Sequence, residues 1–131
     1  MSNVEHPKHY QLSINLEVLD IIKIIMTDGH LNAYQGFVIG NVIKYLFRAD
    51  KKNGLEDYKK ALYYLKKIIS DSVYPTYTDT EKKIIEKVLM TVENKKIRNI
   101  IDEILFLHLH SSQKSLESYI EEQEKKDDKE N

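Results

Sequence analysis

The spacing of apolar and polar residues predicts helices along most of the chain. From Asn15 to about Thr27 the run LEVLDIIKIIMT is apolar almost all round, which is typical of a helix in the centre of a core or in a contact between subunits. Residues 33–50 and 55–70 carry apolar positions three or four apart, the spacing of amphipathic helices, with the turn KKNG between them. The two apolar stripes are Phe37, Val38, Val42, Ile43 and Leu46, and then Leu55, Tyr58, Leu62, Leu65 and Ile69.

The second half of the chain repeats this helical spacing. We expect Asp79 or Thr80 to cap a fourth helix and residues 97–105 to form a fifth. The stretch FLHLHSS, residues 106–112, alternates as a strand would, but no partner strand is evident in the sequence, so we interpret it as helix. A last amphipathic helix is expected over residues 115–126, before an acidic end that frays. The prediction is an all-α fold, a small helical bundle of about five to six helices.

The composition fits a single soluble domain in a reducing compartment. The 131 residues are 41% hydrophobic and 31% charged, and a chain of this length can bury one core. There is no cysteine, which excludes disulfides, thiolate metal ligands and cysteine nucleophiles. No apolar run reaches the roughly 18 residues of a membrane span, and the polar N-terminus does not resemble a signal peptide. We therefore expect a cytoplasmic protein that does not enter membranes.

The charge is unevenly distributed, although the net charge is only −1. Residues 41–68 hold eight Lys or Arg against three Asp or Glu, a local balance of +5. Residues 117–131 hold seven acids against three bases, a local balance of −4. A basic middle predicts an anionic ligand. We divide the chain into a helical core over residues 1–70, expected to carry the ligand site, and a C-terminal helical extension over residues 71–131.

The basic middle contains one polar face at helical spacing. Asn41, Lys44, Tyr45 and Arg48 follow one another at i, i+3, i+4 and i+7, so a helix places all four on one side. Arg presents a planar fork for phosphate oxygens, Lys a point charge, and Asn both a donor and an acceptor. Tyr45 can stack on a base or cover the core, and Lys52 extends the positive charge past the helix end. A plain solvated face remains the alternative, although no acid precedes Arg48 on this predicted helix.

The third predicted helix adds residues to the same surface. Lys60 could contact the same ligand, and Asp57 and Tyr64 lie on its side of the helix. Three roles stay open for Asp57: a hydrogen bond to a ribose hydroxyl, an ion pair with Arg48, or a favourable place in the first turn of its helix. The two helices together therefore predict one anion-binding surface.

The N-terminal stretch HPKHY provides further candidates. It belongs to an extended lead-in over residues 1–14, because Pro7 disfavours helical backbone before it. His6 and His9 have no obvious third ligand, so no metal site is predicted. Either histidine can instead contact a phosphate, and His9 is the candidate proton carrier.

Other kinds of site are weak or missing in the sequence. Glu17 and Asp20 share a helical face and could hold Mg²⁺ only if they faced phosphates. No GxxxxGK[ST] or GxSxG motif occurs, which argues against a P-loop and against a serine-hydrolase elbow. The chain is not basic overall and shows no recognition-helix pattern, so nucleic acid is not an expected partner.

Four motifs, HPKHY, LEVLDII, GNVIKYLFRADKKNG and EDYKKALYYLKKII, resemble in order and spacing a family of small phage and prophage proteins. That family is mostly of unknown function, is often called nucleotide kinase, and includes a coliphage nucleoside monophosphate kinase without a P-loop. Asp50 departs from the family pattern, which often has glycine there, and residues 71–131 have no counterpart in it. The pattern falls on His6, Pro7, His9, Tyr10, Glu17, Asp20, Gly40, Asn41, Lys44, Tyr45, Arg48, Lys52, Asp57, Lys60, Ala61, Tyr64 and Leu65.

The resemblance implies a nucleotide-binding protein, with nucleoside monophosphate kinase activity as the expected chemistry. Mg²⁺ would arrive with ATP, no other cofactor is implied, and a homo-oligomer is expected. Two alternatives remain open: a non-catalytic binder that sequesters a nucleotide signal in counter-defence, and a module that binds a host protein through residues 71–131. The implied catalytic residues are His9, Lys44 and Arg48, and the implied binding residues are His6, Tyr10, Asn41, Lys44, Tyr45, Arg48, Lys52, Asp57, Lys60 and Tyr64.

Overall fold

The all-α prediction is confirmed by the computed structural model, which describes residues 17–51, 53–68 and 74–130. Over those ranges the chain forms six α-helices and one short 3-10 helix and no strand: α1 (Val18–Asp28), α2 (Ala33–Arg48), η2 (Ala49–Lys51), α3 (Leu55–Leu65), α4 (Asp79–Met90), α5 (Lys95–Leu105) and α6 (Leu109–Glu130). None of these helices is long and apolar enough to cross a bilayer. Expectations for the lead-in, for Lys52 and for residues 69–73 lie outside the described residues.

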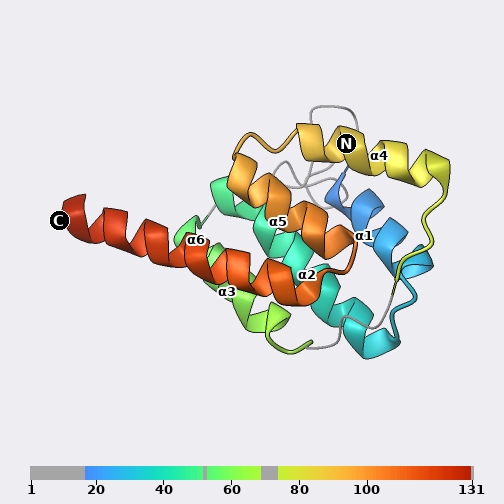
Figure 1. Ribbon diagram of the computed structural model, residues 1–131, viewed down its shortest axis with the longest axis horizontal. Helices are drawn as coiled ribbons and strands as arrows, with labels where there is room; N and C mark the ends of the chain where they lie inside the picture. Colours follow the sequence, from blue (N-terminus) through green and yellow to red (C-terminus); the bar gives the residue numbers. More distant parts are fainter. Residues whose placement is uncertain (1–16, 52, 69–73, 131) are drawn as a thin grey trace, which may run out of the picture.

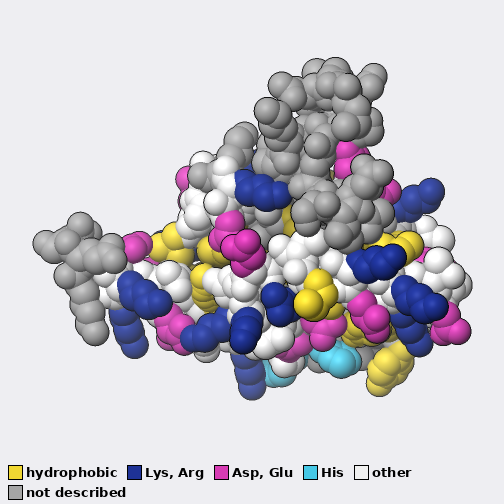
Figure 2. All heavy atoms as spheres, turned by 90° about the horizontal axis from the view of Figure 1, so that it is seen from above, with side chains coloured by type: hydrophobic (Ala, Val, Ile, Leu, Met, Phe, Trp, Pro, Cys, Tyr) yellow, Lys and Arg dark blue, Asp and Glu magenta, His cyan; other side chains and the backbone are white. Residues whose placement is uncertain are grey.

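The helices pack around a central pair formed by α2 and α3. The short turn after η2 lets α3 run back along α2, and α1 and α5 also pack against α2. Helix α6 packs against both α3 and α5, then continues past the other helices to the C-terminus at its tip (Figure 1). On the face seen in Figure 2, Lys and Arg side chains are interspersed with Asp and Glu side chains. The described surface is therefore of mixed charge on that side.

The core is built mainly from isoleucine, leucine and valine at the predicted helical positions. Helix α5 buries the apolar residues Ile97, Ile100, Ile101, Ile104 and Leu105. The predicted stripe of α2 is buried except at one position. That exception is Phe37, whose side chain is 60% exposed. Its ring lies at the edge of the α2/α3 contact and meets Tyr64 edge to face, with centroids 6.4 Å apart. The expectation that Phe37 belongs to the core is therefore wrong.

Helix α1 is half buried rather than enclosed on all sides. Its inner face is buried, but Leu19 is 63% exposed and Met26 is 45% exposed. Its contact with α2 passes over two glycines: a Cβ atom on Gly40 would lie 3.2 Å from the Met26 methyl, and one on Gly36 would lie 3.7 Å from it. The small residue at position 40 thus allows the close approach of α1. The homo-oligomer expected from the sequence stays a prediction.

Several helix ends differ from the predicted ones by a few residues. Thr78, not Asp79 or Thr80, caps α4: its hydroxyl accepts from the Glu81 N–H at 3.1 Å, and the Glu81 carboxylate accepts from the Thr78 N–H at 2.8 Å. This reciprocal pair is a capping box. Helix α3 ends at Leu65 instead of extending to about residue 70.

The stretch 106–112 is helical only in its second part. Leu107 adopts φ = +62°, its N–H bonds to the Ile104 carbonyl, and the His108 N–H bonds to the Glu103 carbonyl at 2.7 Å. These two bonds form a Schellman motif, a helix C-terminus that usually has glycine at the left-handed position. Here a leucine occupies it, and its side chain is 2% exposed, so burial offsets the backbone cost. Helix α6 then begins at Leu109, earlier than predicted, and runs to Glu130.

Candidate functional site

Three cationic side chains converge on the ring of Tyr45. Lys44 Nζ lies 4.6 Å from the ring centroid, Arg48 Cζ 5.3 Å, and Lys60 Nζ 5.6 Å. All three lie within the roughly 6 Å at which a cation is attracted to an aromatic face. Lys44 and Arg48 come from α2, whereas Lys60 comes from α3. The antiparallel packing of these helices thus joins candidates that lie far apart in the sequence.

Tyr64, on α3, stacks against the ring of Tyr45. Its ring is nearly parallel to that of Tyr45, with an interplanar angle of 16° and centroids 6.0 Å apart. Both rings are partly buried and pack against the core. We call the set Lys44, Tyr45, Arg48, Lys60 and Tyr64 the cation–aromatic site.

Asp57 holds Arg48 in place beneath this site. Arg48 Nε donates to Asp57 Oδ2 at 3.1 Å, and the aspartate is fully buried while the arginine side chain is 17% exposed. The other carboxylate oxygen, Oδ1, is buried without a hydrogen-bond partner. Of the three roles open to Asp57, the structure shows the ion pair with Arg48, at a place in the first turn of α3. Because the carboxylate is enclosed, we assign it to positioning Arg48 rather than to contact with a ligand.

Asn41 lies one turn before Lys44 on the same face of α2. Its amide nitrogen donates to the Phe37 carbonyl at 2.9 Å, within its own helix. The side chain is only partly buried. Asn41 therefore borders the cation–aromatic site while its amide group is oriented by the backbone.

The lysines of α3 and Lys66, directly after it, have partners on different sides of the helix. Lys59 pairs with Glu124 at 3.2 Å and Lys66 with Glu117 at 3.6 Å, and both acids belong to α6. Lys60, on the α2 side, pairs instead with Glu56 at 3.5 Å in its own helix. Two acids of the C-terminal helix therefore pair with Lys59 and Lys66, whereas Lys60 lies beside Tyr45.

Asp50, the acid within the basic stretch, has a structural role. Its Oδ1 accepts from the Tyr58 hydroxyl at 2.8 Å, and the Tyr58 ring packs against Tyr119 with centroids 5.2 Å apart. Burial raises the pKa of the Tyr58 hydroxyl well above its ordinary value, and the hydrogen bond to Asp50 adds to the shift. The hydroxyl therefore stays a neutral donor. Asp50 thus links η2 to α3 through the Tyr58 hydroxyl.

Other predicted site residues fall outside this cluster. His6, His9, Tyr10 and Lys52 lie outside the described residues. Asp20 accepts from the Glu17 N–H at 2.8 Å in the first turn of α1, so the acidic pair organises a helix end. Within residues 17–51, 53–68 and 74–130, no three His, Asp or Glu side chains come together as a set of metal ligands.

Three further residues lie next to the cation–aromatic site and are not among the residues predicted from the sequence. Phe37 and Tyr63 both contact the Tyr64 ring, at 6.4 Å and 5.4 Å between centroids, and Tyr63 is 59% exposed. Lys67 Nζ lies 4.8 Å from the Tyr63 centroid. The i, i+4 spacing of Tyr63 and Lys67 was the available signal in the sequence. The signal for Phe37 was weaker, because its position continues the apolar stripe of α2.

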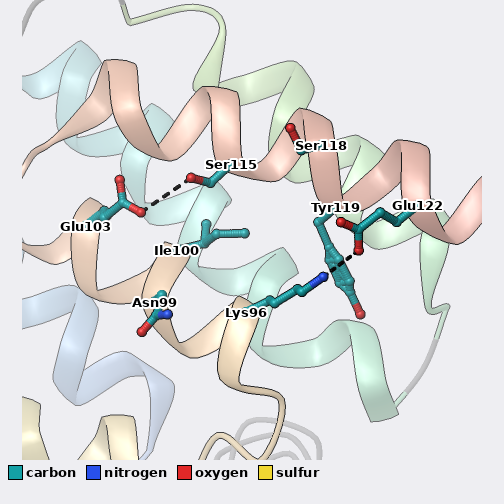
Figure 3. Close-up of a pocket in the computed structure, with 8 residues that line it drawn as sticks. All are labelled: Lys96, Asn99, Ile100, Glu103, Ser115, Ser118, Tyr119 and Glu122. Atoms are coloured by element: carbon teal, nitrogen blue, oxygen red, sulfur yellow. Dashed lines mark hydrogen bonds and ion pairs between the residues drawn. The ribbon is translucent and has the colours of Figure 1, made fainter.

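Two hollows of the molecule lie away from the cation–aromatic site. One, of about 270 Å³, lies between α5 and α6 with Ile100 among its lining residues (Figure 3). Two pairs line it: Lys96 and Glu122 at 2.7 Å, and Ser115 and Glu103 at 3.5 Å. The other, of about 260 Å³, is lined by residues of α2, η2 and α5 and by the segment between α4 and α5. Neither hollow includes a residue of the cation–aromatic site.

Comparison with known proteins confirms the family resemblance of the first half of the chain. Residues 4–66 match the family described as a protein of unknown function, DUF3310. The gene 1.7 protein of Enterobacteria phage T3 is 42% identical over 67 residues, which are 48% of this chain and 39% of that protein. The nucleotide kinase gp1.7 of Escherichia phage T7 is 34% identical over 68 residues, which are 49% of this chain and 33% of that protein.

The similarity is confined to part of each protein. The matched region spans 39% and 33% of the length of these two relatives, and it contains α1, α2 and α3 of the present chain. No solved structure matches the chain. The whole cation–aromatic site lies inside the matched region, whereas α4, α5 and α6 lie outside it. Through residues 4–66, this chain is therefore similar to the DUF3310 family, whose function is unknown.

Proposed function

We propose that the α2/α3 surface binds a nucleotide. The observation that carries the proposal is the convergence of Lys44, Arg48 and Lys60 within 5.6 Å of one tyrosine ring. A nucleotide offers both partners that such a group needs: a flat base for the ring and phosphates for the cations. A plain solvated surface does not require three cations from two helices to meet at one ring.

The buried ion pair supports binding because it prepares Arg48 for its ligand. An arginine that is already held by Asp57 at 3.1 Å loses little side-chain freedom when a phosphate arrives. The guanidinium fork suits two phosphate oxygens, while Lys44 and Lys60 add point charges on either side. The buried Asp57 and the exposed Glu56 offset two of the three positive charges, so the site keeps a positive balance for a phosphate.

Phosphoryl transfer is the chemistry that we propose for this site, supported by the name of the phage T7 relative, nucleotide kinase gp1.7. Positioning and charge stabilisation supply most of the catalysis in such reactions, so a protein nucleophile is not needed. Lys44 and Arg48 would stabilise charge on the transferred phosphoryl group, and His9 would carry the proton from the acceptor. Mg²⁺ would come as part of the MgATP substrate.

Turnover separates the kinase from the sequestering binder. The purified protein is mixed with MgATP and a panel of nucleoside and deoxynucleoside monophosphates, and the products are resolved by ion-exchange chromatography. The kinase proposal predicts ADP together with one or more nucleoside diphosphates. Tight binding of a nucleotide that is recovered unchanged would leave sequestration in a counter-defence role as the function. Absence of any nucleotide binding would overturn both.

Binding of a host protein through residues 71–131 is a separate candidate. Removing that half would strip α5 and α6 from the core, because Ile100, Ile104 and Leu116 are fully or almost fully buried. Substitution of exposed α6 residues is therefore the better test than deletion. Nucleotide binding that survives such substitutions, with loss of a captured host protein, would support a role for this half in partner binding.

A further inference from the structure

The aromatic surface of α2 and α3 continues beyond the cation–aromatic site. Tyr64 stacks on Tyr45 on one side, and two further rings, Phe37 and Tyr63, contact it edge to face with interplanar angles of 78° and 84°. Lys67 lies over Tyr63 at 4.8 Å, repeating the combination of ring and cation seen at Tyr45. We call Phe37, Tyr63 and Lys67 the outer aromatic group.

The two rings of the outer aromatic group, Phe37 and Tyr63, are more exposed than packing of the core requires. Phe37 is 60% exposed and Tyr63 is 59% exposed, whereas Tyr45 and Tyr64 are partly buried. A phenylalanine gains nothing from contact with water, and these two rings come from different helices yet meet the same Tyr64. Because each stands nearly perpendicular to Tyr64, neither is stacked on it face to face. Such rings retain a surface on which a base can stack.

The α2/α3 surface extends well beyond the immediate surroundings of Tyr45. Phe37 and Arg48 lie eleven residues apart on α2, which corresponds to about 16 Å along the helix axis. Phe37, Asn41, Tyr45 and Arg48 are spaced so that they remain on one face over this distance. The connected rings therefore have cations at two places, three at Tyr45 and one at Tyr63.

We infer that this surface holds two nucleotides side by side, one base at Tyr45 and the other on the outer aromatic group. Their phosphates would meet over Lys44, Arg48 and Lys60, with Lys67 supplying charge to the outer nucleotide. The inference rests on the proposed nucleotide function and extends it by a second base subsite. For a phosphoryl transfer it would bring the donor and acceptor phosphates together.

The test compares ligands with one and two bases on the full chain. Isothermal titration is carried out with a mononucleotide and with a dinucleoside pentaphosphate, whose two bases are joined through their phosphates. We expect the two-base ligand to bind at least about tenfold more tightly than the mononucleotide, because linked groups bind together. The Tyr63→Ala variant should lose roughly 5- to 150-fold in affinity for the two-base ligand, the equivalent of one stacked base. Its affinity for the mononucleotide at Tyr45 should be unchanged.

Matched variants and a third ligand make the outcome decisive. Tyr74→Ala removes another exposed tyrosine, 73% exposed, and should leave both affinities unchanged. Phe37→Ala should reproduce the selective loss from the other helix. Mononucleotide binding with no gain from the second base would overturn the inference while leaving the proposed function intact. Tighter binding of a single-stranded oligonucleotide than of the two-base ligand would also overturn it, and no mononucleotide binding at all would overturn both.

Discussion

Arg48 Nε lies 3.1 Å from Asp57 Oδ2, and this ion pair joins α2 to α3 directly beside the ring of Tyr45. The two residues have unequal access to water, since the aspartate is fully buried and the arginine side chain is 17% exposed. Loss of the arginine would strand a charge in the interior, whereas loss of the aspartate charge would leave an arginine that can reach solvent. The pair therefore links the stability of the α2/α3 contact to the geometry of the cation–aromatic site.

Arg48→Ala is expected to destabilise the protein by about 3–5 kcal/mol, because it leaves a buried carboxylate without its cation. Asp57→Asn should cost clearly less, since the amide oxygen can still accept from the Arg48 Nε. Urea unfolding followed by circular dichroism measures both free energies. Lys60→Ala is the control, because its pair with Glu56 is exposed at both ends and should contribute less than about 1 kcal/mol. Equal costs for the Arg48 and Asp57 variants would contradict the asymmetry.

Two glycines of α2 offer a matched test of the close contact with α1. Gly36→Ala should stabilise the protein by about 0.5–1 kcal/mol, because alanine favours a helix interior and its Cβ would lie an ordinary 3.7 Å from the Met26 methyl. Gly40→Ala should gain less or nothing, since its Cβ would lie 3.2 Å from the same methyl and Met26 must move. Thermal unfolding of the two variants gives the comparison. A larger increase in stability for Gly40→Ala than for Gly36→Ala would show that α1 does not approach α2 closely at Gly40.

The raised pKa of Asp102 predicts how the stability of the protein changes with pH. Burial raises the pKa of its carboxyl above the ordinary 3.8, and the neighbouring Glu103 charge adds to the shift, while His108 acts in the opposite direction. A raised pKa means that the folded protein binds this proton more tightly than the unfolded chain. The stability contributed by Asp102 therefore falls as the pH rises from about 3.8 through the folded-state pKa.

Asp102→Asn should consequently raise the unfolding temperature at pH 7, because the charged carboxylate is less favourable in the folded protein than in the unfolded chain. The position near the C-terminal end of α5 acts in the same direction, because a negative charge there opposes the helix dipole. The gain should shrink as the pH is lowered toward 3.8, the ordinary value. Unfolding temperatures of both proteins across this range measure the effect. A difference that grows as the pH falls would have the opposite sign to the prediction.

The sequence was sufficient for the α2 face because that face depends only on helical spacing. Asn41, Lys44, Tyr45 and Arg48 share one side in the structure for the same reason that they were predicted to. The approach of Lys60 and Tyr64 to Tyr45 depends on how α3 packs against α2, which periodicity does not determine. The site is therefore predictable helix by helix, and its assembly is a tertiary property.

Other features could not be predicted because the deciding contact is not local. Asp50 accepts a hydrogen bond from the Tyr58 hydroxyl. The apolar pattern identified Tyr58 as part of a buried stripe, but it could not show where the hydroxyl of that side chain would bind. The break at Leu107 escaped prediction because leucine occupies a left-handed position that sequence signals associate with glycine. Tertiary burial of that side chain overrides the local preference.

The proposed nucleotide site is tested most directly by the effect of single lysines on nucleotide affinity. Lys44→Ala, Lys60→Ala and Lys59→Ala each remove one positive charge, but only the first two residues lie beside Tyr45, and Lys59 pairs with Glu124 on α6. Isothermal titration of each variant with the best-bound nucleotide should show a loss of at least about tenfold for the first two, the scale of one hydrogen bond to a charged group. Lys59→Ala should bind as the natural protein does. Equal affinities for all three variants and the natural protein would contradict the site.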